Sequence, residues 1–545
     1  MNDKPRRSVR VGRTLARHRR ASVALVAAVG CLIITACASS GSSTAQSSGT
    51  SSGSSSVSGT LSIGDTVAPP TLDPSQSASS NVDEIDRAVY DTLVQFTNGP
   101  SPTLQPDLAT SWTVSSNGLT YTFNVRSGVT FHNGAKVTAQ DVKYSLDRIK
   151  SIGTGIYTEL SAYASSKVIS PTKIVITLSS PYRTFLDALS RVYILNSALV
   201  QAHAGTNQGQ TWLATHEAGS GPYELTQFVP NESVSVAYFK KYWGGWSGKH
   251  AANVAWHYYT NGSSEVEALQ SGTVNFAEGL PSDAYSTFAS RSGYTLNVAQ
   301  TGVQLYVAFN TAFGPTKNKL VREAISYAFN YESFIKAAFD GYAVVAHGPM
   351  PSNFPCYDSS TPTSTYDLAK AKQLIQQAHA AGQTVSIEYL PFLAEEKLGY
   401  ELLAPTLQSI GLKTKPLGIA FPAYVSLLKH ASTTPDLGFV YEYPTFLDPN
   451  EVLYEYYDSK FIATGYNWFY YSNPSVDKLL TQAQQQTQVQ NACSQYQQAQ
   501  QAIGSDYTAI NVAVLKWVTV LGPGVKGFSY NLAHHYTVNV YNMSV

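Results

Sequence analysis

The sequence predicts an α/β protein with more than one lobe. Its 545 residues exceed the roughly 100–200 residues of a typical domain, so the chain is long enough for several cores. Hydrophobic residues make up 43% of the chain, which is enough to fill such cores. From Leu61 onward, segments with the two-residue period of strands alternate with segments that have the period of helices.

Seven segments have the pattern of strands. Leu119–Val125, for example, alternates apolar and polar side chains and is followed by the turn residues Arg126-Ser127-Gly128. In chain order, the expected strands are Leu61–Val67, Leu119–Val125, Lys173–Leu178, Ser233–Phe239, Thr384–Leu390, Leu437–Val440 and Ile510–Val520.

Four segments have the pattern of amphipathic helices. The apolar residues of Leu320–Phe339 fall largely on one stripe. The other expected helices are Leu368–Ala380, Glu395–Ile410 and the Gln-rich segment Val476–Ile503, which we expect to be broken.

The N-terminus has the three parts of an export signal. Residues 1–20 contain eight Lys and Arg residues, the last of which is Arg20. An uncharged run follows from Ala21 to Ala36. A run of this length is short for a membrane span of about 20 residues. The residues Ile34-Thr35-Ala36 before Cys37 resemble the lipobox of bacterial lipoproteins. We therefore expect residues 1–36 to be a signal peptide and Cys37 to carry acyl chains such as palmitate, which would anchor the protein to the outer face of the cell membrane.

A tether follows the predicted lipidation site. Residues 38–60 contain twelve Ser and four Gly, a composition that cannot form a core and behaves as a flexible linker. The sequence thus predicts that residues 37–60 join the anchor to the folded body.

The charge balance argues against a nucleic-acid partner. Lys plus Arg and Asp plus Glu are 36 each, so there is no basic excess to neutralise phosphates. Because the basic residues concentrate before Arg20, the part after the signal is mildly acidic. Cys356 and Cys493 remain in that part, and they form either a disulfide or two buried thiols.

A series of motifs in the folded body resembles the motifs of one protein family. They include L-Q-P-D-L-A-T-S-W from Leu104, T-A-Q-D-V-K-Y-S-L-D-R-I from Thr138, G-S-G-P-Y-E-L from Gly219, V-R-E-A-I-S-Y-A-F-N from Val321 and L-D-P-N from Leu447. This series resembles the family 5 extracellular solute-binding proteins, the peptide- and nickel-binding subunits of ABC importers. The resemblance implies a two-lobed α/β fold of the periplasmic-binding-protein type (type II), with an extra subdomain in the first lobe.

The same resemblance implies a layout of the lobes. Residues 61–96, 218–305 and 512–545 would form lobe I, residues 97–217 its extra subdomain, and residues 306–511 lobe II.

The segment Val440 to Asn450 is the candidate for ligand contacts, because loops that follow strands often carry them. In peptide-binding relatives an Asp four residues before the proline of D-P pairs with the peptide's amino group. Thr445 occupies that position here, and Glu442 is the nearby carboxylate that would replace it. The aromatic residues Tyr441, Tyr443, Phe446 and Trp468 offer faces to a solute, or they pack in the core. Val67 and Ala68 match the family's first-strand backbone contacts.

The sequence gives little support for a catalytic or a metal-binding function. His132 stands alone near a turn and is expected to be a structural hydrogen-bonder, while His534-His535 is expected at the surface. No H-E-x-x-H, C-x-x-C or P-loop pattern occurs. We therefore expect neither an enzyme nor a bound cofactor or metal.

The predicted function is that of a monomeric receptor. It would capture a peptide-like solute between two closing lobes and deliver it to an ABC permease and its ATPase subunits. Nickel chelates or oligosaccharides are the alternatives within the class, and a secreted hydrolase is the alternative outside it.

Overall fold

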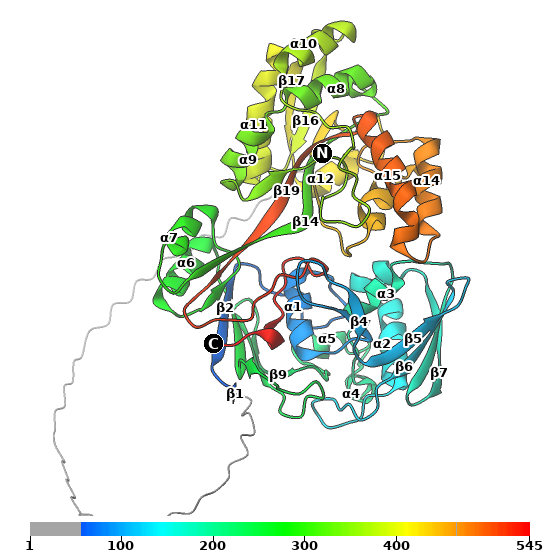
Figure 1. Ribbon diagram of the computed structural model, residues 1–545, viewed down its shortest axis with the longest axis vertical. Coiled ribbons are helices and arrows are strands. Elements are labelled where there is room, and N and C mark those ends of the chain that lie inside the picture. Colours follow the sequence, from blue (N-terminus) through cyan, green and yellow to red (C-terminus); the bar gives the residue numbers. More distant parts are fainter. Residues whose placement is uncertain (1–55, 465) are drawn as a thin grey trace, which may run out of the picture. The chain divides into compact units, whose positions relative to one another are not determined.

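The computed structural model describes residues 56–464 and 466–545 (Figure 1). The predicted signal peptide 1–36, the predicted lipidation site Cys37 and most of the predicted tether lie outside the described residues. The tether ends earlier than expected, because β1 (Ser56–Val57) pairs in parallel with β11 (Lys249–His250) and β2 begins at Thr60. Within the described ranges, no helix has the length and apolar character needed to span a membrane.

An 11-stranded mixed sheet forms the centre of the fold. Its strands lie in the order β17 (Lys413–Gly418), β16 (Thr384–Tyr389), β18 (Leu437–Glu442), β14 (Thr295–Phe309), β19 (Ala509–Leu521), β13 (Phe276–Ala277), β2 (Thr60–Asp65), β12 (Asn253–Tyr258), β10 (Ser233–Tyr238) and β9 (Tyr223–Val229), and β15 (Ala343–Val345) pairs with β19.

The long antiparallel strands β14 and β19 join the two halves of this sheet (Figure 1). β14 pairs with β18 only through its second half, Gln304–Phe309, whereas β19 pairs with β13 at its end, Val520–Leu521. The register between β14 and β19 shifts between Gln300 and Gln304, so residues 301–303 leave the ladder where the two halves meet. Such an irregularity bends the strand that carries it.

A second, four-stranded antiparallel sheet consists of β5 (Ala109–Val114), β6 (Thr120–Val125), β8 (Lys173–Leu178) and β7 (Tyr163–Ser170). Helix α2 (Ala139–Ile152) begins at a capping box formed by Thr138 and Asp141, which satisfies amide groups of its first turn. The short pair β3 (Val94–Phe96) and β4 (Leu104–Pro106) adjoins it. Except for Phe446, the buried residues of this core lie between Leu93 and Ile194, and we call this part the 93–194 unit.

Helices cover the sheets (Figure 1). Beside α2, the described residues contain α1 (Ser80–Val89), α3 (Phe185–Ala188), α4 (Ser197–Ala202), α5 (Gln210–Leu213), α6 (Gly262–Ser271), α7 (Tyr285–Ala289), α8 (Lys319–Ala328), α9 (Tyr331–Phe339), α10 (Leu368–Gln377), α11 (Ala394–Ser409), α12 (Phe421–Leu427), α13 (Glu455–Tyr457), α14 (Pro474–Gln484) and α15 (Val489–Ser505).

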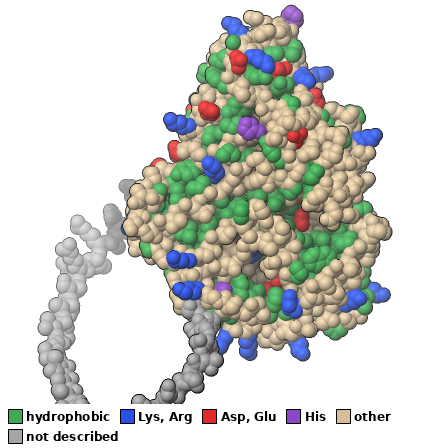
Figure 2. Space-filling view, viewed as in Figure 1, with side chains coloured by type: hydrophobic (Ala, Val, Ile, Leu, Met, Phe, Trp, Pro, Cys, Tyr) green, Lys and Arg blue, Asp and Glu red, His purple; other side chains and the backbone are tan. Residues whose placement is uncertain are grey.

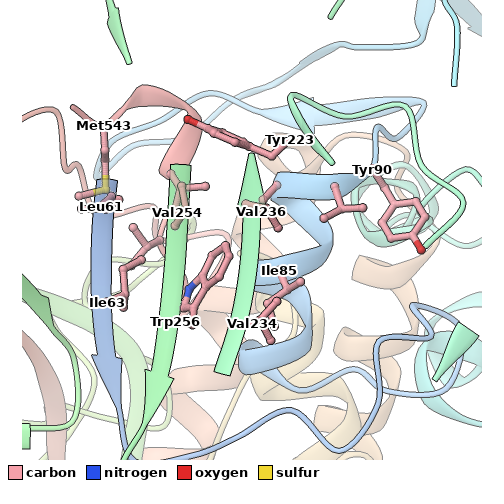
Figure 3. Close-up of a cluster of buried hydrophobic side chains, with 14 of the residues drawn as sticks. Leu61, Ile63, Ile85, Tyr90, Tyr223, Val234, Val236, Val254, Trp256 and Met543 are labelled. Atoms are coloured by element: carbon pink, nitrogen blue, oxygen red, sulfur yellow. The ribbon is translucent and has the colours of Figure 1, made fainter. Parts of the chain in front are cut away.

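One core joins the two ends of the folded body. Figure 3 shows Leu61 of β2 and Val254 and Trp256 of β12 in the same cluster as Ile85 of α1. Met543, near the C-terminus, is fully buried in this cluster. The first strand and the last residues therefore stabilise one another.

Most of the expected elements are confirmed, with ends that shift by at most three residues. The expected helix Leu320–Phe339 is instead two helices, because Phe329 is extended and the Asn330 side chain accepts a hydrogen bond from the amide of Ser333, which caps α9. The expected break in Val476–Ile503 separates α14 from α15. The predicted lobe boundaries 305/306 and 511/512 fall inside β14 and β19 and stay a prediction.

The surface carries few charges. Figure 2 shows single Lys, Arg, Asp and Glu side chains separated by wide uncharged areas, as expected for a chain with 13% charged residues. The charged groups that the fold buries therefore stand out as candidates for function.

Candidate functional site

The loop after β18 is fastened to the 93–194 unit. The Arg183 side chain donates two hydrogen bonds to Asp448, one of them 3.0 Å long from Nε to Oδ2. It also donates to the carbonyl of Ala483 at 3.1 Å and to the hydroxyl of Tyr496 at 2.6 Å. One buried guanidinium thus holds together segments that lie far apart in the sequence.

Thr445 and Phe446 make the next contacts of this loop. The Thr445 hydroxyl donates to Glu159 Oε1 at 3.4 Å, across 286 residues of chain. Phe446 is 1% exposed and packs in the core of the 93–194 unit. It is therefore a core residue, and the structure does not bring it to the other predicted aromatic contacts.

Tyr441 and Tyr443 lie together, with ring centroids 6.1 Å apart. The Tyr441 hydroxyl donates to Glu395 at 3.0 Å, whereas Tyr443 is 61% exposed. Trp468 belongs to a different aromatic group, since it stacks on Tyr424 at 5.7 Å. Its Nε1 has no hydrogen-bond partner in the described part of the chain.

Glu442 points to the opposite face of β18 from its neighbours Tyr441 and Tyr443, as strand alternation requires. It is 2% exposed, and it lies near enough to Tyr306 and Glu455 to interact with them electrostatically. Burial, reinforced by Glu455, raises the pKa of Glu442 well above its usual value. Its role as the partner of an amino group stays a prediction.

Val67 and Ala68 follow β2 directly. Val67 is 55% exposed, but its carbonyl already accepts a hydrogen bond of 3.0 Å from Asn81. The carboxylate of Asp65 accepts from the amide of Thr66 at 2.6 Å and orients this segment. Their predicted role in ligand binding also stays a prediction.

Arg191 is a buried cation with an unsatisfied donor. The residue is 8% exposed, and its Nε has no partner among the described residues. Burial raises the pKa of the Glu159 carboxyl, and the guanidinium of Arg191 opposes that rise. At Asp83 burial likewise opposes ionisation, but Arg191 and His534 outweigh it and lower the pKa.

The expectation that His534 and His535 lie at the surface is wrong. They are 2% and 7% exposed, because the C-terminal segment packs into the core that contains β2. His534 Nδ1 lies 3.0 Å from Asp83 Oδ2. Burial and the neighbouring Arg191 lower the pKa of His535 to about 3, so this imidazole is neutral. Its Nε2 is unpartnered within the described ranges.

Three glutamates lie near enough to influence one another electrostatically, although they come from two parts of the chain. Glu159 belongs to the 3-10 helix Gly155–Leu160 of the 93–194 unit, whereas Glu451 and Glu455 follow the loop after β18. Burial raises the pKa of each carboxyl, and mutual repulsion raises those of Glu451 and Glu455 further.

A cavity of about 230 Å³ adjoins one of these glutamates, Glu455. Glu455 lines it together with Thr158, Tyr182, Asn450, Tyr454 and Lys460. Asn450 is 2% exposed and Glu451 4%. In the described part of the chain, Asn450 Oδ1 and Glu451 Oε1 have no hydrogen-bond partner. The term junction is used below for the region that contains the cavity, Asn450, Glu451, Arg191 and the loop after β18.

The remaining candidates from the sequence have structural roles. His132 Nδ1 lies 2.8 Å from Glu217 and Nε2 lies 3.0 Å from the carbonyl of Gly221, which confirms it as a structural hydrogen-bonder. Cys356 and Cys493 form a disulfide. No group of three or more His, Cys, Asp or Glu side chains suited to a metal ion occurs in residues 56–464 and 466–545.

The sequence did not identify Glu159, Arg191, Glu451 or Glu455. Glu451 and Glu455 stand four residues apart directly after the D-P motif, a spacing that places side chains on one helix face. That signal was present. Glu159 and Arg191 lie in segments with no distinguishing pattern, and only the fold brings them to the junction.

Comparison with known proteins gives one family and one fold. The model of "Bacterial extracellular solute-binding proteins, family 5 Middle" matches residues 103–463. The glutathione-binding protein GsiB of Salmonella paratyphi A is 30% identical over 310 residues, which are 56% of this chain and 59% of GsiB. The match thus spans less than two thirds of that curated relative.

Two solved structures share the fold over nearly their full length. The periplasmic binding protein DppA from Helicobacter pylori, in complex with the peptide STSA, superimposes with a TM-score of 0.73 at 23% identity and covers 90% of this chain and 99% of DppA. NikZ from Campylobacter jejuni, in complex with Ni(L-His), has a TM-score of 0.73 at 22% identity and covers 89% of this chain and 99% of NikZ. The predicted two-lobed fold of the periplasmic-binding-protein type is confirmed.

Proposed function

Because the chain belongs to the family 5 bacterial extracellular solute-binding proteins, we propose that it is the solute-binding receptor of an ABC importer. Its ligand is a peptide-like solute that the two lobes enclose. The relatives support this class of ligand, since one is named for glutathione and another was solved with a peptide.

The observation that carries this proposal is the set of buried, unpartnered polar groups at the junction. At the junction, Arg191 Nε, Asn450 Oδ1 and Glu451 Oε1 lack partners among the described residues, as does Nε2 of His535, whose pKa the neighbouring Arg191 lowers. Burying such groups without hydrogen bonds costs about 1–3 kcal/mol each. A peptide-like solute supplies both acceptors and donors and would offset this cost, with a carboxylate at Arg191 and an N–H group at the acceptors.

Closure would take place about the irregular segment of β14, residues 301–303. There the two long strands lose part of their pairing, while β14 pairs with β18 on one side and β19 pairs with β13 on the other. A solute stabilises the closed arrangement only by its higher affinity for that arrangement. The receptor then presents the closed form to a permease, and ATP hydrolysis takes place in other subunits.

The anchor and the oligomeric state are part of the same proposal. Residues 1–36 direct export, acylated Cys37 holds the protein at the outer face of the cell membrane, and the protein acts as a monomer without catalysing a reaction.

A ligand screen tests the proposal. Peptide pools, nickel chelates and oligosaccharides are added to the purified protein, and thermal unfolding is followed. A solute at 100 times its dissociation constant should stabilise the native state by about 2.7 kcal/mol. The hit should reduce the radius of gyration in solution scattering and be recovered intact by mass spectrometry. A hit that is chemically converted would contradict the proposal and indicate a hydrolase.

A further inference from the structure

We propose that Glu159, Glu451 and Glu455 form a subsite for a positively charged group of the bound solute, an ammonium or a guanidinium. This inference rests on the receptor function proposed above and adds the charge that the solute must carry at one end.

Of the three glutamates, Glu451 is the one without a neighbouring cation. Its charged neighbours are Glu455, Glu159 and Asp448, all of them acidic, and Asp448 is already paired with Arg183. The backbone of Thr445 hydrogen-bonds to Glu451, but Oε1 is left without a partner in the described ranges. A buried carboxylate with a free oxygen and no cation is unfavourable until a donor reaches it.

Asn450 gives an independent indication of the same kind of ligand. Its Oδ1 accepts no hydrogen bond from any described residue, and the side chain lines the cavity of about 230 Å³ beside Glu455. An amide oxygen only accepts hydrogen bonds. The two buried oxygens without a partner on this side of the junction, Asn450 Oδ1 and Glu451 Oε1, are therefore both acceptors, which suits a group with several N–H donors.

Three tyrosines lie near the glutamates. Tyr182, Tyr456 and Tyr466 all lie close enough to Glu451 and Glu455 for these carboxylates to raise their pKa values, although burial is the larger cause. Ring faces attract ammonium and guanidinium groups. Since no arrangement suited to a metal occurs among the described residues, an organic cation fits the site better than a metal ion.

The subsite also links the charge of the solute to closure. Glu159 lies on one side and Glu451 and Glu455 on the other, so closing brings like charges together as water leaves. The protein's own cations compensate only part of this negative charge. Arg191 lies beside Glu159 and Lys460 beside Glu455, but Glu451 has no such neighbour. A cation from the solute would complete the compensation and favour the closed form.

The experiment compares probes that differ only in charge. Ala-Arg-Ala and Ala-citrulline-Ala are titrated into the wild-type protein by calorimetry, each with a free and with an acetylated amino terminus. N-butylguanidine and its neutral urea analogue, N-butylurea, test the cation alone. We expect the best cationic probe to bind about tenfold or more tightly than its neutral counterpart.

Two conservative variants assign the preference to the cluster. In Glu451→Gln and Glu455→Gln the preference for the cationic probe should fall about tenfold, while binding of the neutral probe should not weaken. Glu401→Gln, which removes a carboxylate that is 53% exposed, is the control and should keep the preference. Circular dichroism and melting temperature establish that each variant is folded.

The outcomes separate this inference from the receptor function. Peptides that bind equally well with Arg and citrulline would overturn the cation subsite and leave the receptor. Binding of N-butylguanidine that Glu451→Gln abolishes, without binding of any peptide, would support the subsite and reject a peptide ligand. Failure of both N-butylguanidine and the peptides would overturn both. Stabilisation by NiCl2 or MgCl2 alone, lost in Glu451→Gln, would replace the organic cation with a metal.

Discussion

Replacing Arg183 with Met removes the fastening between the 93–194 unit and the loop after β18. The guanidinium contacts Asp448, the carbonyl of Ala483 and the hydroxyl of Tyr496, and the side chains of Arg183 and Asp448 are only 5% and 7% exposed. Met fills much of the same volume, but Asp448 stays behind as a buried charge without its partner. Such a loss costs about 3–5 kcal/mol, so we expect the free energy of unfolding of R183M to fall by that amount.

Urea denaturation, followed by tryptophan fluorescence and by circular dichroism, measures this change. The double variant R183M/D448N removes the unpaired charge and retains an acceptor for the amide of Asn450, which Asp448 Oδ1 binds at 2.8 Å. It should therefore recover a large part of the lost stability. The control R291M alters an exposed arginine next to Tyr294 and should change stability by less than about 0.5 kcal/mol.

Two results would refute the reasoning. If R183M loses less than about 1 kcal/mol, the pair does not fasten the two parts. If the double variant is as unstable as R183M, the unpaired charge is not the cause of the loss.

Three further expectations follow from the sequence and the structure. C37S should release the protein from membranes or leave it unprocessed, and membrane fractionation showing a normally trimmed, membrane-bound variant would contradict lipidation. Peptides with a free amino terminus should bind about tenfold or more tightly than acetylated ones if Glu442 binds the amino group, and equal affinities in calorimetry would reject that role. Burial and Glu396 raise the pKa of Glu388 to about 9 from its usual 4.5; the stability that the protonated form contributes is full below 4.5 and is lost as the pH rises toward 9. E388Q should therefore flatten the fall in melting temperature over this range, and an unchanged pH profile would contradict the assignment.

The sequence predicts local elements well where one physical signal decides them. Lys173–Leu178 has the expected bounds because its alternation and its β-branched residues agree. The helix break at Asn330 was missed, since the apolar stripe continues across it and hides the capping residue. The short strands β3, β4 and β13 have too few residues for any period to be visible.

The candidate site was predicted only in part. The loop after β18 was identified, and Thr445 does contact another part of the chain. The sequence could not show the direction of Glu442; in the structure, alternation along β18 separates it from Tyr441 and Tyr443. Arg191 and Glu159 could not be identified from the sequence, because only tertiary packing removes their charges from water.

The core shared by Leu61 and Met543 also determines when folding can finish. Thr60 of β2 pairs with Asn253, Phe276 pairs with Leu521, and the C-terminal segment completes the cluster. Contacts between residues so distant in sequence slow folding, because the chain loses the entropy of closing a long loop before these contacts can stabilise it. Because the chain is synthesised from its N-terminus, it cannot complete this core until its last residues have been made. The nascent protein therefore stays without its first core during synthesis, a state compatible with passage through a membrane as an unfolded polypeptide. Removing only the last few residues would for the same reason disturb the region around the first strand.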